Sequence, residues 1–226
     1  MNAQEYCEMV EQKDNQNKQR VSKIRIIEDH SPLVSLKESG FNLLFEPSTK
    51  KDYRYLVREA IVEKIGRISR FLEKEDKILI IRSVWRSFDH QRLIWDNKVK
   101  FLRQIHPFKK LEEINEMVSH FIAPETESMH STGGAVDALI FDRKNVCVMD
   151  FGTNEGLNID LNKQCYPRHP DITPIAKKNR KLLIHLFEKE DFVVDVKEYW
   201  HFDYGNVIWA MEKKKKHAIY GLIKDK

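Results

Sequence analysis

Two short stretches of the sequence carry histidines whose surroundings could support chemistry. His130 lies in Ser-Met-His-Ser-Thr-Gly-Gly-Ala-Val-Asp, upstream of Asp137, and His201 closes the stretch Glu-Tyr-Trp-His. Two histidines and one aspartate are three ligands, the number that a catalytic zinc ion takes while it keeps a fourth position open for water. One interpretation is therefore that His130, Asp137 and His201 share a divalent cation.

The surroundings of Asp137 leave two interpretations open. Its neighbours within residues 135–141 are small or apolar, and an ionised carboxylate buried in such a strand costs several kcal/mol unless it is paired or binds a metal. An imidazole from the preceding turn could share a cation with it. Alternatively, Asp137 accepts backbone N–H bonds from the Gly133-Gly134 turn, where glycine permits a positive φ, and His130 is exposed.

Glu198 precedes His201 by three residues and is a further candidate for chemistry. A carboxylate beside the water of a catalytic zinc site can take a proton from that water. Residues three apart on a regular strand point to opposite faces, so both serve one site only if the backbone is irregular or one acts from the flank. The alternative is an ordinary Glu at a strand end, with the histidine half buried beside Trp200. The positive charge that stabilises the oxyanion formed during hydrolysis could come from Arg82 or Arg86, and the sequence spacing does not distinguish them.

The elements that must position these residues follow from apolar periodicity and turn signals. Apolar residues at three- and four-residue steps predict helices, short Ile- and Val-rich runs predict strands, and Thr173-Pro174 has the pattern of a helix start. The predicted helices are residues 52–74, 89–104, 110–122 and one that begins at Thr173-Pro174; the predicted strands are residues 77–85, 135–141, 145–151 and 192–196, with edge strands and loops in residues 23–45. This order is an α+β pattern whose sheet is antiparallel at least around residues 135–151.

The length and composition favour a single globular domain. The chain has 226 residues, of which 41% are hydrophobic. We place the domain at residues 21–226, and the polar residues 1–20 are expected to form a mobile or loosely docked extension. No apolar run is long enough to span a membrane, and residues 1–20 lack the apolar stretch of a secretory signal. The cysteines Cys7, Cys147 and Cys165 are too few and too far apart for a disulfide framework, so the cytoplasm is the expected location.

The charge balance does not call for a nucleic acid or a membrane as partner. The net charge is +4, and basic and acidic residues are well mixed. Lys213–Lys216 is the one strong basic run, and it lacks the interleaved aromatic residues that would stack on bases. We interpret it as a solvated segment. Nothing in the composition sets an oligomeric state.

The order of the candidate residues resembles one enzyme family. The pattern Ser128-x-His130-x-x-Gly133-x-Ala135-x-Asp137, followed much later by Glu198-x-Trp200-His201, is similar to the zinc D-alanyl-D-alanine dipeptidases, the VanX-like branch of the M15 metallopeptidases. The resemblance extends more loosely from about Pro32 to Asn206. It implies an M15/hedgehog-like architecture, with one α+β domain whose central sheet is mainly antiparallel and flanked by helices.

The resemblance also implies a role for each residue of the site. It implies that His130, Asp137 and His201 hold one Zn²⁺ per chain and that Glu198 is the general base. It implies that Arg86 binds the substrate carbonyl and that Ser128 contacts the substrate. Glu155 is a further candidate for substrate binding, because it lies next to a position where the family has a binding residue.

The implied reaction is zinc-dependent hydrolysis of the small peptide D-Ala-D-Ala to two D-alanines. One alternative is a carboxypeptidase or endopeptidase that acts on D-Ala-containing muropeptides with the same zinc site. The other is a zinc-binding module without turnover, although structural zinc sites usually close with four ligands and here three candidates appear.

The sequence departs from the family pattern at three positions. Ser83 and Ser87 stand where the family has Asp and Pro around the essential arginine, so the support of Arg86 differs. Gly156 stands where the dipeptidases have an Asp that holds the free ammonium of the substrate. Glu155 or Asp160 could compensate. Without compensation, recognition of a free N-terminus is weaker, whereas the zinc chemistry is unaffected.

Overall fold

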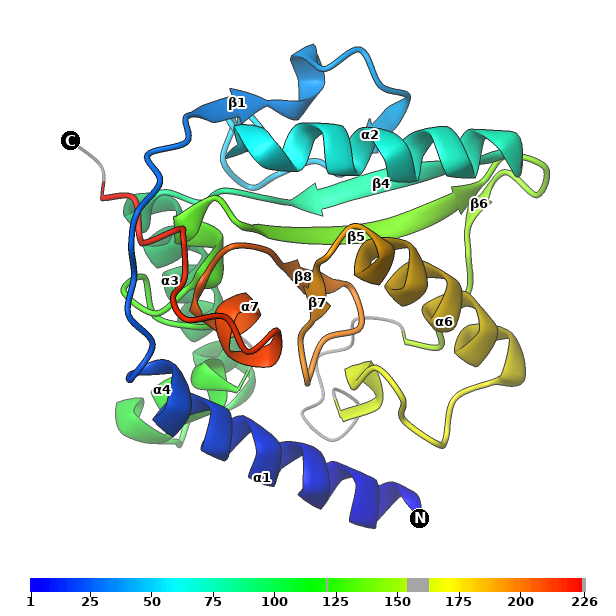
Figure 1. Cartoon of the computed structure of the whole chain (residues 1–226). Helices are drawn as coiled ribbons and strands as arrows, with labels where there is room; N and C mark the ends of the chain where they lie inside the picture. Colours follow the sequence, from blue (N-terminus) through cyan, green and yellow to red (C-terminus); the bar gives the residue numbers. More distant parts are fainter. Residues whose placement is uncertain (121, 154–162, 225–226) are drawn as a thin grey trace.

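A central sheet organises the computed structural model, which describes residues 1–120, 122–153 and 163–224 (Figure 1). The strands are β2 (Leu43–Phe45), β4 (Lys77–Ser83), β5 (Ala135–Asp142), β8 (His201–Asp203) and β7 (Val193–Val194), in that spatial order, and β6 (Cys147–Val148) pairs with the far end of β5. Among the described strands of this sheet, β2 and β4 run parallel, and the other neighbouring pairs are antiparallel. The predicted α+β fold with a mainly antiparallel sheet flanked by helices is confirmed.

The two longest strands, β4 and β5, form the centre of the sheet, where their apolar side chains pack together. Leu79 pairs with Ile140 and Ile81 with Ala138, and all four are fully buried. The register then shifts between Ile81 and Ser83, so that Ser83 lies opposite Asp137. Irregularities of this kind re-aim side chains and recur beside active sites. Here the shift lies at the end of β4 where the chemistry-bearing residues begin.

Two helices supply most of the remaining core. Helix α2 (Glu59–Lys74) lies along β4 in Figure 1 and buries its apolar face, including Ile61, Ile65 and Leu72. Helix α6 (Pro174–Lys189) begins as predicted: Thr173 caps it by accepting a hydrogen bond from the backbone N–H of Ala176. Phe187 of α6 stacks on Phe202 of β8 with ring centroids 3.8 Å apart. This contact fixes the strand that carries His201.

The predicted helices at residues 89–104 and 110–122 are confirmed as α3 (Phe88–Ile105) and α4 (Leu111–Ser119). They pack on each other through Leu102, Ile114 and Val118. Ser87 caps α3 by accepting a hydrogen bond from the backbone N–H of His90. The strand β4 therefore leads directly into α3 through the segment that contains Arg86.

Two predicted boundaries are wrong. The helix predicted from residue 52 begins only at Glu59, because the preceding residues form β3 (Leu56–Arg58), which pairs with β1 (Leu33–Ser35). The strand predicted at residues 145–151 is reduced to Cys147–Val148, which are both exposed. At the start of α2, a pairing between separated segments decides the structure, and local periodicity does not report it. At β6, only two residues pair with β5.

Residues 1–20 do not form the mobile or loosely docked extension that their polarity predicts. They belong to α1 (Ala3–Val21), which opens with a capping box between Asn2 and Glu5. Tyr6, Cys7 and Val10 are buried against Tyr166. The helix is thus docked by a small apolar patch together with polar contacts such as the Lys13–Glu212 ion pair.

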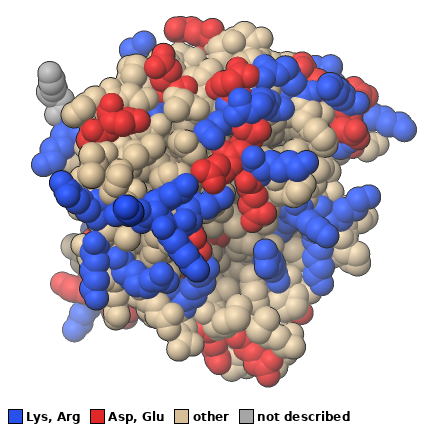
Figure 2. Space-filling model, in the orientation of Figure 1, with Lys and Arg blue, Asp and Glu red and all other residues tan. Residues whose placement is uncertain are grey.

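The rest of the chain connects these elements with short helices and turns. The 3₁₀ turns are η1 (Leu36–Glu38), η2 (Met129–Thr132) and η3 (Lys163–Cys165), and α7 (Val207–Glu212) follows β8. The basic run Lys213–Lys216 follows α7, and Lys213 pairs with Asp191 at 2.8 Å. Figure 2 shows basic and acidic side chains interspersed over most of the visible face, with Lys and Arg more numerous on its left side. Among the described residues, no helix combines the length and apolarity needed to cross a membrane.

Candidate metal centre

Three elements bring His130, Asp137 and His201 together. His130 lies in the turn η2, Asp137 in β5 and His201 in β8, and Asp137 and His201 are direct partners in the antiparallel register of the two strands. One ligand atom from each of the three lies within 4.8 Å of the others. All three residues are buried, with exposed fractions of 5%, 6% and 8%. The cluster combines the residue types singled out in the sequence.

The imidazole of His130 is fixed by the backbone of the segment after β4. Its Nδ1 lies 2.8 Å from the carbonyl oxygen of Val84, so this nitrogen must carry the proton and donate it. Its Nε2 lies 3.2 Å from Oδ2 of Asp137. Burial, together with the nearby charge of Arg86, lowers the pKa of His130 to about 4, which keeps the ring neutral as metal ligation requires.

The imidazole of His201 lies between two carboxylates. Its Nδ1 is 2.9 Å from Oδ1 of Asp137, and its Nε2 is 3.3 Å from Oδ1 of Asp203. Burial by itself would lower the pKa of His201, but the two carboxylates outweigh it and raise this pKa well above its usual value. The same imidazoles lower the pKa of Asp137 despite its burial. Asp137 is therefore ionised, and its two carboxylate oxygens attract positive charge to the space between them and the two imidazoles.

These contacts fit a divalent cation. The nitrogens Nε2 of His130 and Nδ1 of His201 each face one oxygen of Asp137, while the other nitrogen of each ring is committed to an acceptor outside the cluster. Because Nδ1 carries the proton of the neutral His130 ring, its Nε2 is an acceptor, and Oδ2 of Asp137 repels it unless a cation lies between them. Two imidazole nitrogens and a carboxylate oxygen are also the donor types that zinc prefers. The donor set and the ring orientations thus suit zinc.

The alternative interpretation of Asp137 is wrong in this structure. The backbone N–H of Gly133 donates to the carbonyl of His130, and that of Gly134 donates to Oγ1 of Thr132, so the glycine turn is satisfied without Asp137. His130 is buried and not exposed. Gly133 adopts a φ of 74°, in the left-handed region that favours glycine. The glycine turn therefore ends η2, which carries His130, and leads into β5, which carries Asp137.

Arg86, of the two candidate arginines, contacts the cluster. Its Nη2 donates to Oδ2 of Asp137 at 3.1 Å, while its Nε donates to Oγ of Ser83 at 2.8 Å and its Nη1 to Oε1 of Gln91 at 3.2 Å. Ser83 thus supports the guanidinium although it replaces an aspartate of the family pattern. Arg82 pairs instead with Glu46 at 2.8 Å. The sequence spacing carried no signal for this choice.

Glu198 reaches the cluster from an irregular segment before β8. Its backbone N–H donates to Oδ1 of Asp195, and its carbonyl accepts the N–H of His201 across a turn, so the two residues are not on one regular strand. Burial of the carboxyl, together with the charges of Asp137 and Asp195, raises the pKa of Glu198 to about 8. The charges of Asp137, His201 and Arg86 therefore act on the carboxyl of Glu198.

Ser128 is the remaining predicted site residue that the structure describes. Ser128 is buried at the start of η2, two residues before His130. Glu155, Gly156 and Asp160 lie outside the described residues. His90 is buried, and its ring centroid lies 5.0 Å from that of Tyr53. The contacts of Asp203, Gln91 and His90 were missed, because none of them belongs to a motif with a recognisable spacing.

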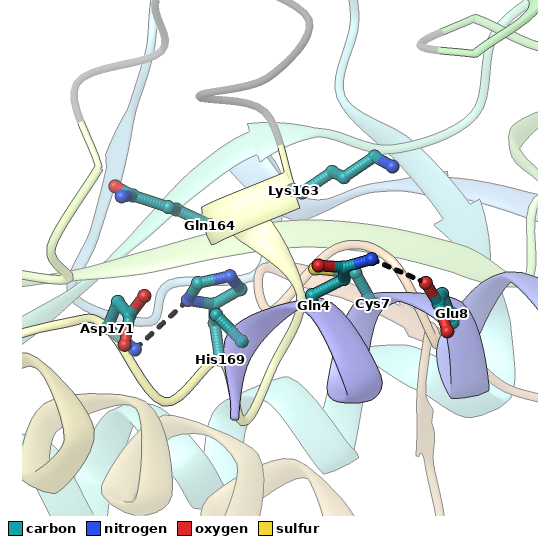
Figure 3. A pocket seen from close by; sticks show the side chains of 8 residues that line it. Gln4, Cys7, Glu8, Lys163, Gln164, His169 and Asp171 are labelled. Carbon is teal, nitrogen blue, oxygen red and sulfur yellow. Dashed lines mark hydrogen bonds between the residues drawn. The ribbon is translucent and has the colours of Figure 1, made fainter. Parts of the chain in front are cut away.

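A cavity in the part of the chain that the structure describes lies elsewhere. It has a volume of about 420 Å³ and lies between α1 and the segment around η3 (Figure 3). Its polar side chains contact neighbouring groups: Gln4 donates to Glu8, and Nδ1 of His169 accepts the backbone N–H of Asp171. None of its lining residues belongs to the histidine–aspartate cluster.

The geometry agrees with a comparison against protein families. The model of the Peptidase_M15 family, described as D-ala-D-ala dipeptidase, matches residues 45–218. The chain belongs to the M15 peptidase family. This range contains every described residue of the candidate metal centre and leaves out α1.

Individual proteins that resemble this chain match it over part of its length or at low sequence identity. D-alanyl-D-alanine dipeptidase of Escherichia coli (strain K12) is 32% identical over 77 residues, which cover 34% of this chain and 37% of that protein. Among solved structures, the LD-carboxypeptidase LdcB is 20% identical with a TM-score of 0.46, covering 84% of this chain and 76% of that chain. The D,D-pentapeptidase VanY, in complex with Zn(II), is 13% identical with a TM-score of 0.46, covering 76% and 86%.

Proposed function

We propose that the chain is a zinc-dependent dipeptidase of the VanX-like branch, which hydrolyses D-alanyl-D-alanine to two D-alanines. The observation that carries the proposal is the buried cluster of His130, Asp137 and His201, with Arg86 in contact and Glu198 beside it. The description of the matching family and the partial match to the Escherichia coli dipeptidase support this substrate.

In this proposal one Zn²⁺ per chain is held by Nε2 of His130, the carboxylate of Asp137 and Nδ1 of His201. When bound, zinc supplies Lewis acidity toward the scissile carbonyl and lowers the pKa of water to about 7. The neutral state of His130 and the ionised state of Asp137 are the ones in which both residues can ligate.

Glu198 acts as the general base and then as the general acid. Its carboxylate takes a proton from the water that attacks the carbonyl carbon, and it returns that proton to the nitrogen of the departing D-alanine. A carboxyl group with a raised pKa suits both steps, because proton transfer is most efficient when the pKa lies near the working pH.

Arg86 binds the carbonyl oxygen as negative charge develops on it. The guanidinium is held by Ser83 and Gln91, so it is oriented before the substrate arrives. Ser128, at the start of the turn that carries His130, is proposed to contact the substrate beside the metal.

A specific feature of the sequence favours a second candidate, a carboxypeptidase or endopeptidase that cleaves D-Ala-containing wall peptides. Gly156 replaces the aspartate with which the dipeptidases hold the free ammonium. If Glu155 does not take over this role, a peptide with an acylated amine should bind as tightly as the free dipeptide.

The test is to measure the metal content of the purified chain together with hydrolysis of D-Ala-D-Ala and of its N-acetylated form. We expect about one zinc per chain, release of D-alanine from the free dipeptide, and loss of turnover on chelation. Faster cleavage of the acetylated peptide would favour the second candidate. A zinc-loaded chain that cleaves neither would be a binding module, and the proposed activity would be wrong.

A further inference from the structure

Asp203 is a buried carboxylate that the proposed mechanism does not use. It lies two residues after His201 on β8 and is 1% exposed. Its Oδ1 lies 3.3 Å from Nε2 of His201 and accepts a hydrogen bond of 2.6 Å from Nδ2 of Asn206. Its Oδ2 is buried and has no hydrogen-bond partner among the described residues. A buried charge with one unused oxygen is costly, so its retention calls for a compensating positive partner.

The partner that the geometry offers is the outer nitrogen of His201. An ionised carboxylate only accepts hydrogen bonds, so Nε2 of His201 must carry a proton to contact it. The other nitrogen, Nδ1, is then the one that faces Asp137 at 2.9 Å and is available to a cation. A cation on Nδ1 polarises the ring and makes the Nε2 proton a stronger donor, which is the compensation that Asp203 needs.

Asp203 is itself held in place from two sides. Its backbone is paired with Ala135 of β5 and with Val193 of β7, in the interior of the sheet. Its carboxylate is fixed by Asn206, which is fully buried and caps α7: Oδ1 of Asn206 accepts the backbone N–H of Trp209, which leaves Nδ2 for Asp203. The cap of α7 thus sets the orientation of Asp203, and Asp203 sets that of His201.

We propose that Asp203 is a positioning residue of the metal centre, which keeps the proton of His201 on Nε2 and presents Nδ1 to the metal, and that Asn206 holds Asp203 in this arrangement. The inference rests on the proposed function, because it requires the histidine–aspartate cluster to bind a metal. Asp203 touches neither substrate nor metal, so its effect is on metal affinity and ring orientation.

The first test is the zinc affinity of Asp203→Asn, which removes the charge and keeps the shape. Zinc is titrated in competition with a chromophoric chelator, and we expect the dissociation constant to rise about 10- to 100-fold, the usual cost of losing the partner of a ligating histidine. Wild-type affinity in the folded variant would overturn the inference. If the wild-type chain itself failed to bind zinc, the proposed function would fall with it, so the two failures are distinguishable.

The second test uses Asn206→Ser, in case Asp203→Asn does not fold. Serine is also a good helix cap, so α7 keeps its start while Asp203 loses the amide donor. We expect zinc binding to weaken several-fold, by less than in Asp203→Asn. Asn179→Ser is the matched control, because this buried asparagine donates to the carbonyl of Asp150, outside the metal centre. Equal zinc affinities of the Asn206 variant, the control and the wild type would contradict the inference.

A third readout concerns the ring itself. In the zinc-loaded wild-type chain, long-range proton–nitrogen NMR spectra should show His201 with a proton on Nε2 and with Nδ1 on the metal. A metal on Nε2 would overturn the inference whatever the affinities, because Asp203 would then have no donor to accept from.

Discussion

Asp137 is the residue on which the candidate centre converges. Its two carboxylate oxygens face the imidazoles of His130 and His201, and Arg86 donates to one of them. Removing one member of a buried charged group leaves the other charges uncompensated. The free energy lost in this way exceeds the free energy that the intact group contributes to stability. Substitutions that keep the shape of the side chain are therefore the informative ones at this site.

Glu198→Gln should separate metal binding from turnover. The amide keeps the size of the side chain but cannot take a proton, so we expect kcat for D-Ala-D-Ala to fall about 10²- to 10⁴-fold. Zinc content, measured on the same preparation, should stay at the wild-type value. The control is Glu188→Gln on the exposed face of α6, which should be as active as wild type. Wild-type turnover in Glu198→Gln would exclude this residue as the base.

Arg86→Ala should lower kcat about 10²- to 10³-fold, the typical cost of losing one oriented donor to an oxyanion. The matched control is Arg92→Ala, an exposed arginine on α3 whose ion pairs with Asp89 and Glu125 lie at the surface. If both variants had the activity of wild type, Arg86 would have no part in binding the carbonyl oxygen.

His90 should make the stability of the fold depend on pH. Burial, with the charges of Arg86 and Lys50, lowers the pKa of His90 from 6.5 to about 4. Between these values the unfolded chain binds a proton that the folded chain does not, so the free energy of unfolding falls as the pH falls from about 6.5 toward 4.

Replacing His90 should remove this dependence. We expect His90→Gln to reduce the loss of stability over that pH range by up to about 3 kcal/mol, measured by urea unfolding at several pH values. His185→Gln, at an exposed position of α6, is the control. An unchanged pH profile in His90→Gln would show that this histidine titrates normally in the folded chain.

At the scale of the elements, register decides which side chains meet. Asp137 lies between Ser83 of β4 and His201 of β8, and the register shift after Ile81 produces this row. A slip of one residue would turn each of these side chains to the other face of the sheet. The apolar pattern of β4 and β5 indicates which side chains are buried, but it does not predict the register shift that places Ser83 opposite Asp137.

The turn between η2 and β5 provides a test at this scale. Gly133 has a φ of 74°, and a β-carbon placed on it would lie 2.6 Å from Cδ2 of Leu33. Gly133→Ala should therefore lower the free energy of unfolding by about 1–2 kcal/mol for the left-handed backbone, and further because Leu33 must move. Zinc affinity should fall as well, since His130 and Asp137 flank this turn.

Gly40→Ala is the control for the backbone contribution. Gly40 has almost the same φ, 75°, and among the described residues no atom lies within 4 Å of an added β-carbon. We expect a loss of about 1 kcal/mol without any change in zinc affinity. Equal losses in the two variants would show that the contact with Leu33 relaxes freely.

At the scale of the whole molecule, α1 is part of the folded unit although it lies outside the residues that match the M15 family. It docks through a small apolar patch at Tyr6, Cys7 and Val10 and through ion pairs to α7 and to Lys197. We infer that it stabilises the fold without touching the described metal centre.

Val10→Ala should test the docking of α1. Val10 is 5% exposed, and its truncation should lower the free energy of unfolding by about 1–2 kcal/mol, measured by urea or heat. Met9→Ala is the control, because Met9 is 47% exposed on the same helix and should change stability by less than about 0.5 kcal/mol. A Val10 variant as stable as the control would mean that α1 is only loosely attached, as its polarity suggests.

Residue types, spacing and local patterns predict a kind of chemistry and most of the helices and strands. Histidine and aspartate side chains can ligate zinc, which indicates the kind of chemistry. Apolar residues at helical spacing favour an amphipathic helix, so α3, α4 and the start of α6 follow from local features. The roles of His130, Asp137, His201 and Glu198 could be predicted from residue type and order, and they remain to be tested by experiment.

Only the tertiary structure decided which side chains face one another. It brought Arg86 rather than Arg82 to Asp137, placed Asp203 behind His201, and docked α1 on the body of the fold. Each of these outcomes depends on register, ring orientation or contacts between residues far apart in the chain. Local composition carries no information about such contacts, because their free energies arise only when distant segments pack together.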